Sequence, residues 1–183
     1  MGNNVGLLLM LHYGSPGQKA EWVDDLAAGK RHFAFGITEP AHGSDATFME
    51  TFAQRDAVGW VINGEKTWNT GVHAASHDLI FARTSGAPGS GEGITAFLVP
   101  VDAPGFTVEE YLWTFNMPTD HAHVSFTDVR VRDSAILESG EDLEMARANR
   151  SDEFRLRIPI PELTPLRMPP STRDTAVREV LTT

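Results

Sequence analysis

Apolar residues recur at helical intervals in the first thirty positions. Residues 5–12 are almost continuously apolar and predict a buried helix, which Gly14 would end. A second helix is predicted up to Gly29, because residues 20, 22, 23 and 26 form an apolar stripe with helical spacing. Its boundary signals are an N-cap side chain, a proline at the first helical position, a glutamine at the third and a terminal glycine, namely Ser15, Pro16, Gln18 and Gly29.

From residue 31 onward the pattern changes to short runs rich in β-branched and aromatic residues, separated by turn residues. These runs occupy residues 32–38, 47–54, 59–62, 65–70, 79–83, 94–100, 106–112 and 122–127. Strands at this spacing predict a closed or sandwiched antiparallel β-domain. Asn63-Gly64 lies between two of the runs and predicts a hairpin turn there. Residues 85–93, SGAPGSGEG, predict a flexible loop.

The chain is therefore expected to have three parts. Residues 1–30 are helical and residues 31–146 form the β-domain. Residues 147–183 are predicted to be an irregular tail with one short helical turn near 173–181. The tail contains the prolines that forbid a long helix, namely Pro159, Pro161, Pro165, Pro169 and Pro170.

The charge, the cysteine content and the length of the apolar runs exclude several classes of function. The 183 residues carry a formal net charge of −10, which argues against nonspecific nucleic-acid binding, since that needs Lys and Arg against phosphates. The absence of cysteine excludes a disulfide scaffold, a thiolate nucleophile and cysteine-based metal sites. No apolar run approaches the ~20 residues of a membrane span, so no membrane span is expected. Local dipoles and a few Arg remain able to hold a small anionic ligand.

Four histidines have spacings that suit a metal, four apart or two apart. No HExxH pattern or carboxylate-rich helix accompanies them. These histidines are predicted to be surface or loop residues, and no metal site is expected. The four are His73, His77, His121 and His123.

Segments in order along the chain resemble the acyl-CoA dehydrogenase family. They are YGSPGQKAEWVDDLAAGK (13–30), FAFGITEPAHGSDAT (33–47), VINGEKTWNTG (61–71), and ITAFLVPVDAPGFTVEE (94–110) followed by MPTDHAHVSFTDVRV (117–131). The resemblance covers roughly residues 5–146. It implies that this mainly β chain is the antiparallel β-barrel middle domain of that family, preceded by two short helices. It also implies FAD as cofactor and α,β-dehydrogenation of an acyl-CoA thioester.

The resemblance assigns site residues in the segment 33–47. Phe35, Ile37 and Thr38 would line the isoalloxazine, with Thr38 bonding its polar edge. Ser44 would contact the pyrophosphate region of FAD and the pantetheine of acyl-CoA. The glycine and small residues of the segment TEPAHGSD, 38–45, let backbone N–H groups approach a ligand closely. The alternative is a tight loop in which Ser44 and Asp45 only cap a turn.

Trp68 and Thr70 are two residues apart in a predicted strand, so their side chains are expected to share a face. By resemblance, the indole packs beside the flavin ring and the Thr70 hydroxyl reaches N5, where a hydrogen bond would stabilise the reduced flavin. The alternative is a Trp68 that anchors the core, with Thr70 as an ordinary strand residue. Thr84, before the flexible loop, is a candidate contact for the nucleotide end of CoA.

No catalytic base is assigned, because Glu138, Glu141, Glu144 and Glu153 lie in no matching motif. The leading hypothesis is a fragment of an FAD-dependent acyl-CoA dehydrogenase that is incomplete for catalysis. Open alternatives are a non-catalytic flavin- or acyl-CoA-binding or assembly domain, and a related flavin monooxygenase or nitroalkane oxidase. The resemblance also implies an electron acceptor, either an electron-transfer flavoprotein or another one, and assembly as a homo-oligomer. It implies a location in the bacterial cytoplasm or in the mitochondrial or peroxisomal matrix.

Overall fold

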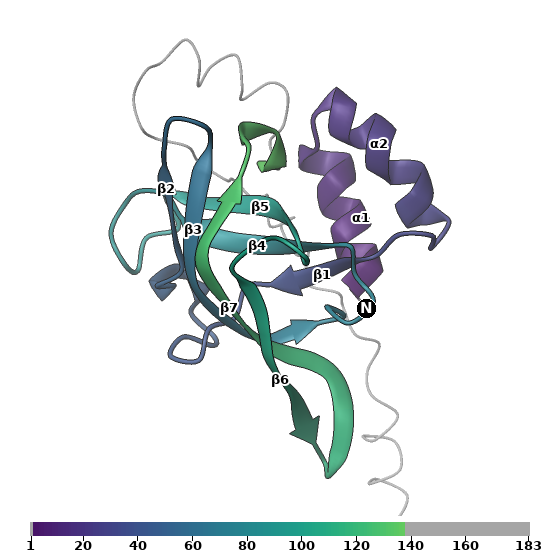
Figure 1. Ribbon diagram of the computed structural model, residues 1–183, viewed down its shortest axis with the longest axis vertical. Helices are drawn as coiled ribbons and strands as arrows, with labels where there is room; N and C mark the ends of the chain where they lie inside the picture. Colours follow the sequence, from purple (N-terminus) through teal and green to yellow (C-terminus); the bar gives the residue numbers. More distant parts are fainter. Residues whose placement is uncertain (1, 138–183) are drawn as a thin grey trace, which may run out of the picture.

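The computed structural model describes residues 2–137, with side chains from Val5 onward. The predicted tail at 147–183 and the last part of the predicted β-domain, 138–146, lie outside the described residues. Two helices, α1 (Gly2–Tyr13) and α2 (Pro16–Ala27), lie side by side against one flank of a single β-sheet (Figure 1). The prediction of two short helices before a mainly β domain is confirmed.

The boundaries of α2 follow the sequence signals. The Ser15 hydroxyl accepts a hydrogen bond from the Gln18 backbone N–H at 3.2 Å, and the Gln18 side chain accepts one from the Ser15 N–H at 2.9 Å. This capping box satisfies two N–H groups that the first turn leaves without helical partners. Gly29, with φ of +66°, follows the last turn. The Gln18 amide also donates to the carbonyls of Ser134 and Ile136, which ties α2 to the chain beyond the sheet.

Seven strands form one sheet, in the order β1-β4-β2-β3-β7-β6, with β5 paired to β4. They are β1 (Phe33–Gly36), β2 (Phe52–Arg55), β3 (Trp60–Thr70), β4 (His77–Arg83), β5 (Ile94–Pro100), β6 (Phe106–Thr114) and β7 (Met117–Val131). The expectation of a purely antiparallel sheet is wrong, because β1 and β2 both run parallel to β4. The sheet is therefore mixed.

The parallel pairings arise because β1 and β2 follow one another in the space between β3 and β4. Residues 33–36 of β1 pair with residues 77–80 of β4, and Phe52 of β2 pairs with Arg83 at the far end of β4. On the other side, β3 pairs with β2 through its first half and with β1 at Thr70. Residues 37–51 leave the sheet between the two strands. This excursion contains the TEPAHGSD segment, 38–45.

The hairpin predicted at Asn63-Gly64 is wrong, because β3 runs continuously through both residues. The turn between β2 and β3 lies earlier, where the Asp56 carboxylate accepts hydrogen bonds from the N–H groups of Val58 and Gly59. Asn63-Gly64 instead faces an irregularity in β7, and the Asn63 amide bonds both the backbone and the side chain of Asp128. The backbone freedom of Asn-Gly thus accommodates a bulge rather than a turn.

Two apolar clusters occupy the two faces of β4 and β5. One cluster includes Ile80, Ala82, Phe97 and Val99 and fills the inside of the curved sheet. The other includes Leu79, Phe81, Leu98 and the helix residues that pack on them, among them Met10, Trp22 and Leu26. Alternation along a strand sends successive side chains to opposite faces, so both strands are buried on both sides.

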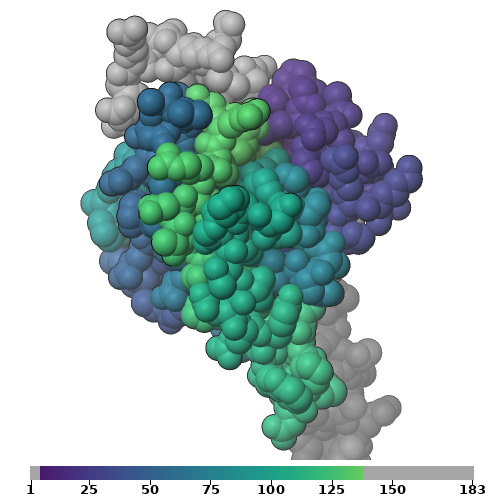
Figure 2. Space-filling model, viewed as in Figure 1, coloured from purple at the N-terminus to yellow at the C-terminus, as the bar shows by residue number. Residues whose placement is uncertain are grey.

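Strands β6 and β7 extend beyond the body of the sheet as a two-stranded ribbon (Figures 1 and 2). The hairpin turn at its tip is Phe115-Asn116, both with positive φ of 48° and 57°, between the paired Thr114 and Met117. That geometry is typical of two-residue hairpin loops. The tip exposes Trp113, Phe115 and Met117, with Phe115 96% exposed.

Candidate functional site

Three residues on neighbouring strands form a row across one face of the sheet. Phe35 of β1 is directly paired with Thr70 of β3, and Thr70 is directly paired with His121 of β7. Directly paired residues present their side chains on the same face. The Thr70 hydroxyl lies 2.9 Å from Nδ1 of His121. The row therefore joins an aromatic ring, a hydroxyl and an imidazole.

Trp68 stands beside this row at a bulge in β3. Between the pairs Lys66–Val124 and Asn69–Ala122, β3 has two residues where β7 has one. Trp68 is one of these two β3 residues. Its φ is +57°, and its side chain is 48% exposed. Its ring centroid lies 6.2 Å from that of His121, and its carbonyl accepts a hydrogen bond from the Thr70 hydroxyl at 3.3 Å. The structure thus brings Trp68 and Thr70 together around His121.

A bulky residue in the left-handed region is uncommon and strained, and such residues cluster at functional sites. An indole left half in water adds an apolar surface with no partner among the described residues that would cover it fully. The alternative in which Trp68 anchors the core is therefore not what the structure shows. The chain holds this ring outward at a conformational cost.

The other residues expected around the isoalloxazine approach the same region from β1 and its continuation. Phe35 packs edge-on against Phe81 with centroids 5.5 Å apart, and both Phe35 and Ile37 pack partly buried against the helix-side core. The carbonyl of Thr38 accepts a hydrogen bond from the Thr67 N–H at 2.9 Å. That bond fixes the start of the 37–51 excursion next to the Trp68 bulge.

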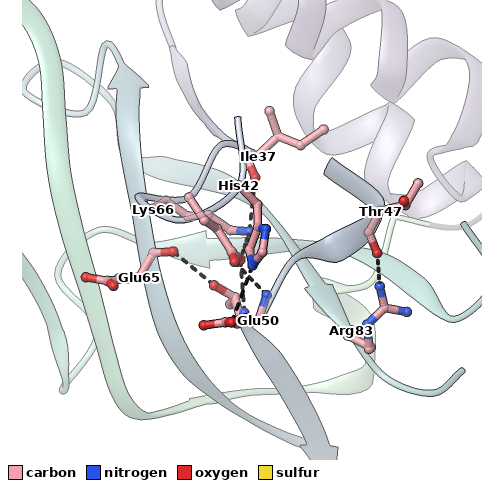
Figure 3. A network of polar contacts seen from close by, with 9 residues as sticks. Ile37, His42, Thr47, Glu50, Glu65, Lys66 and Arg83 are labelled. Carbon is pink, nitrogen blue, oxygen red and sulfur yellow. Dashed lines mark hydrogen bonds and ion pairs between the residues drawn. The ribbon is translucent and has the colours of Figure 1, made fainter. Parts of the chain in front are cut away.

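A buried ion pair closes the interruption between β1 and β2. The Lys66 ammonium lies 2.7 Å from Oε1 of Glu39 and donates to the carbonyl of Ile37 at 3.2 Å, in the group of contacts that Figure 3 shows. The same Glu39 carboxylate accepts hydrogen bonds from the N–H groups of Glu50 and Thr51. Glu39 thus ties the beginning of the excursion to its end.

The electrostatics of this pair balance burial against attraction. Burial alone would raise the pKa of Glu39, but the Lys66 charge and the hydrogen bonds to the carboxylate outweigh it and the pKa is lowered. For Lys66, burial outweighs the attraction of Glu39 and lowers the pKa. A carboxylate with two backbone N–H donors and an ammonium group at 2.7 Å is held ionised.

Ser44 and Thr84 lie away from the row, in two segments that contact one another. Ser44 is exposed, and Asp45 after it accepts hydrogen bonds from the backbone and hydroxyl of Thr47, so the turn-capping interpretation holds for Asp45. The Thr84 hydroxyl is within 3.1 Å of the Gly93 carbonyl and 3.0 Å of the Thr95 hydroxyl, at the base of the β4–β5 loop.

Arg83 links these two segments. Its guanidinium donates to the Thr47 carbonyl, as Figure 3 shows, and to the Ser85, Ser90 and Glu92 carbonyls of the β4–β5 loop. The Gly89 N–H also donates to the Thr47 carbonyl, at 3.0 Å. The loop predicted to be flexible at 85–93 is therefore held against the segment that follows Ser44.

None of the four histidines predicted to be surface or loop residues is buried, but only His73 lies in a loop. His73 is exposed and lies between β3 and β4. His77 begins β4 and packs on Trp22, while His121 and His123 lie in β7, and His123 Nε2 is 2.8 Å from Glu65 Oε2. In the described part of the chain, no three His, Asp or Glu side chains are grouped so as to hold a metal ion. No described helix is long and apolar enough to span a membrane.

A cleft of about 340 Å³ lies between the excursion and strands β3 and β7. It is lined by Glu39, Pro40, Ala41, Glu50, Thr51, Gly64, Glu65, Ser125, Phe126 and Thr127. None of the predicted site residues lines it, and three glutamates make it unsuited to a pyrophosphate. The cleft is thus separate from the row.

Sequence reasoning missed the polar residues that support the row. Lys66, Asn69 and Asp78 are all fully buried, and His121 contacts Thr70 directly. A charged or amide residue inside an otherwise apolar strand was the available signal, as in HDLIFA at 77–82. Their partners come from other strands, which local pattern does not reveal.

Comparison with known proteins gives the family. The profile described as "Acyl-CoA dehydrogenase, middle domain" matches residues 34–129, more than half of the chain. Human mitochondrial short-chain specific acyl-CoA dehydrogenase is 36% identical over 150 residues, which cover 80% of this chain and 36% of that protein. Acyl-CoA dehydrogenase FadE29 of Mycobacterium tuberculosis is 36% identical over 69% of this chain and 32% of that protein.

Solved structures agree with the sequence relatives. The crystal structure of a glutaryl-CoA dehydrogenase from Mycobacterium smegmatis in complex with FADH2 has a TM-score of 0.64 and 35% identity, and the match covers 74% of this chain and 35% of that one. The chain thus spans about a third of the length of the relatives it matches. With the mixed sheet, the two helices and the profile match in agreement, the chain belongs to the acyl-CoA dehydrogenase family, and residues 34–129 match the middle domain of that family.

Proposed function

We propose that this chain supplies the flavin- and acyl-CoA-binding wall of an FAD-dependent enzyme that dehydrogenates acyl-CoA thioesters between the α- and β-carbons. The observation that carries the proposal is Trp68, strained at φ +57° and half-exposed beside the hydroxyl of Thr70. A flat apolar wall with one hydroxyl at its edge suits an isoalloxazine ring, which has two apolar faces and a polar rim. The FADH2 complex of a relative with 35% identity supports FAD as the ligand.

Each residue of the row has a part in holding the cofactor. Trp68 covers one side of the ring and excludes water from it, and Phe35 and Ile37 extend the apolar surface towards β1. Thr70 offers its hydroxyl to N5, and Thr38 contributes at the pyrimidine edge. When bound, FAD supplies an acceptor for the hydride that leaves the β-carbon.

The acyl-CoA would extend past Ser44 towards Thr84. The support for this path is the contact between the two segments through Arg83 and Thr47, which brings an exposed serine near the base of the β4–β5 loop. Thr84 uses its hydroxyl inside the loop, so its part is to hold the loop rather than to bind CoA directly. Ser44 is the substrate contact in this proposal.

The described residues offer no carboxylate in the row itself, and the Asp120 carboxylate beside it lies 3.7 Å from Nδ1 of His121. We therefore assign no base for the α-proton, and we propose that residues 2–137 bind the reactants without completing the reaction. General-base help is typically worth ~10²–10⁴ in rate. An electron-transfer flavoprotein or another electron acceptor, assembly as a homo-oligomer, and a bacterial cytoplasmic or a mitochondrial or peroxisomal matrix location complete the proposal.

The test is a titration of the purified chain with FAD, followed through flavin fluorescence and visible absorbance. The native chain is expected to bind FAD, and Trp68→Ala to bind it much more weakly. Trp113→Ala is the matched control, because Trp113 is also exposed, at 68%, but lies at the tip of the β6–β7 ribbon. Equal binding by Trp68→Ala and the native chain would overturn the assignment of the wall.

The second part of the proposal has its own measurement. Acyl-CoA added without oxygen to the FAD-loaded chain is expected to leave the flavin oxidised. Bleaching of the visible flavin band at a steady rate would mean that the chain contains a base that we have not assigned.

A further inference from the structure

Directly behind the Trp68 bulge lies a fully buried polar pair. Asn69 of β3 and Asp78 of β4 are both 0% exposed, and the Asn69 amide nitrogen donates a hydrogen bond to Oδ2 of Asp78. Among the described residues, neither Oδ1 of Asn69 nor Oδ1 of Asp78 has a hydrogen-bond partner. Two buried acceptors are thus left over in one small pair, although buried polar atoms are normally paired.

The surroundings of Asp78 do not supply a counter-ion in direct contact. Asp78 pairs in the sheet with Ala34 on one side and Val99 on the other, both members of the inner apolar cluster. Lys66 is the charged group that acts on Asp78, but its ammonium is bound to Glu39 and to the Ile37 carbonyl. His77, next to Asp78 along β4, packs on Trp22 under the helices.

One added proton would let the two unpaired oxygens form a hydrogen bond with each other. A carboxyl group and a carboxamide that already share one N–H···O bond leave two oxygens, one on each group. If the free carboxyl oxygen carries a proton, it becomes a donor for the free amide oxygen, and all four groups of the pair are used. Burial raises the pKa of Asp78 to about 7, against the opposing effects of Asn69 and Lys66, which supports the protonated form.

We propose that Asn69 and Asp78 form a neutral carboxamide–carboxylic acid pair that positions Trp68 and Thr70 on the site face of β3. Asn69 is the residue between them, and its side chain points inward while Trp68 points out. Anchoring Asn69 to β4 therefore fixes the backbone on both sides of it. The meaning of this position for a flavin rests on the proposed function, whereas the pair itself does not.

The sheet leaves room for this pair at Gly36. A Cβ at that position would lie 2.6 Å from Cδ1 of Ile80 and 3.1 Å from the Asn69 amide nitrogen. A side chain on β1 would therefore push against Asn69. Because Gly36 has no side chain, this space is left to the Asn69 amide, which bonds Asp78.

The test is a pH titration of the purified chain by NMR, without FAD, between about pH 5 and pH 9. The side-chain carboxyl carbon of Asp78 is expected to report a protonated acid at the acidic end and to titrate near neutrality. The Asn69 amide signals are expected to shift with the same midpoint. An Asp78 carbon signal typical of a carboxylate over the whole range would overturn the proposal, and this measurement needs no variant.

The link to Trp68 is tested by comparing its indole N–H signal in the native chain and in Asp78→Asn. An amide at position 78 can form the same two-bond pair with Asn69 but cannot titrate. His121, Asp120 and the His123–Glu65 pair also face this region, so shifts that they cause persist in the variant. The shift component with the Asp78 midpoint is expected to vanish in Asp78→Asn and to remain in the control Asp24→Asn, an exposed residue of α2.

A Trp68 signal with the same pH dependence in Asp78→Asn and in the native chain would overturn the positioning role. Failure of the chain to bind FAD would instead count against the proposed function and leave the pair standing. The two ideas are thus separable in one set of samples.

Discussion

Lys66 and Glu39 are paired inside the protein, across the gap between β1 and β2, with Nζ 2.7 Å from Oε1 and side chains 0% and 4% exposed. Glu39 also accepts hydrogen bonds from the N–H groups of Glu50 and Thr51, so the pair joins both ends of the 37–51 excursion to β3. Removing one member leaves the other as an unpaired buried charge.

Lys66→Met and Glu39→Gln are each expected to lower the free energy of unfolding by about 3–5 kcal/mol, the usual cost of stranding a buried charge. The double variant is expected to lose less than the sum of the two, because neither charge is then stranded. Urea unfolding of the four proteins measures the coupling. Additive losses would mean that the two side chains do not act as a pair.

The pair also predicts acid sensitivity. The pKa of Glu39 is lowered in the folded protein, so its contribution to stability is present above the pKa of the unfolded chain and is lost as the pH falls through the folded value. The native chain is expected to lose stability below about pH 4.5 more steeply than the double variant. Unfolding midpoints in urea across the acid range give this comparison.

Asp78 is expected to give the opposite pH dependence. Its pKa is raised to about 7 in the folded state, so the folded protein keeps a proton that the unfolded chain releases. Its stability contribution is complete below the unfolded pKa and declines as the pH rises towards 7. Asp78→Asn should therefore match the native chain at or below about pH 4 and be more stable, by on the order of a few kcal/mol, above about pH 8. Urea unfolding at the two pH values tests the sign, and a less stable variant at the higher pH would contradict it.

Parts of the fold with local signals follow from the sequence. The strand at Ile94–Pro100 and the capping box of α2 match the predictions because apolar pattern and cap chemistry are local. The Asn63-Gly64 hairpin failed because the same dipeptide suits a positive-φ bulge, and only the partner strand, through Asp128, distinguishes the two. The hairpin at Phe115-Asn116 carries no glycine and gave no signal.

The parallel pairing of β1 and β2 with β4 had no local signal either. It joins β1 to residues 77–80 of β4, far along the chain, and the Lys66–Glu39 pair beside it links residues 27 apart in sequence. The site shows the same division. Trp68 and Thr70 are site candidates because of their segment, whereas the contacts of His121 and Asn69 are created by three strands together.

Gly64 offers a test of the bulge. Its φ is +140°, and a Cβ there would lie 2.6 Å from Cα of Thr51, a backbone atom that cannot move aside. Gly64→Ala is expected to destabilise the protein by more than about 1 kcal/mol, since the strained φ and the contact both oppose it. Gly91→Ala is the matched control, because nothing lies within 4 Å of its added Cβ and its φ is not positive. Equal thermal unfolding of the two variants would contradict the account of the bulge.

The Thr70 hydroxyl has a single proton and two possible acceptors within the protein. Trp68 O and His121 Nδ1 are both within its reach, at 3.3 Å and 2.9 Å. If His121 carries a proton on Nδ1, it donates to Thr70 and leaves the hydroxyl proton free for a flavin. If Nδ1 is bare, it competes for that proton.

Thr70→Val removes the hydroxyl at nearly constant volume and should lower the two-electron potential of the bound flavin. A neutral hydrogen bond is worth ~0.5–1.5 kcal/mol, which corresponds to a fall of roughly 10–30 mV. His121→Phe keeps a ring against Trp68 but removes Nδ1, the atom that contacts the Thr70 hydroxyl. The part of its effect on the potential that passes through Thr70 is expected to disappear when Thr70 is already Val. Redox titration of the native chain and of the single and double variants, with FAD bound, measures both effects on the potential. An unchanged potential in Thr70→Val at normal FAD content would reject the hydrogen bond to N5. The row of Phe35, Thr70 and His121 would still stand, because it rests on strand pairing.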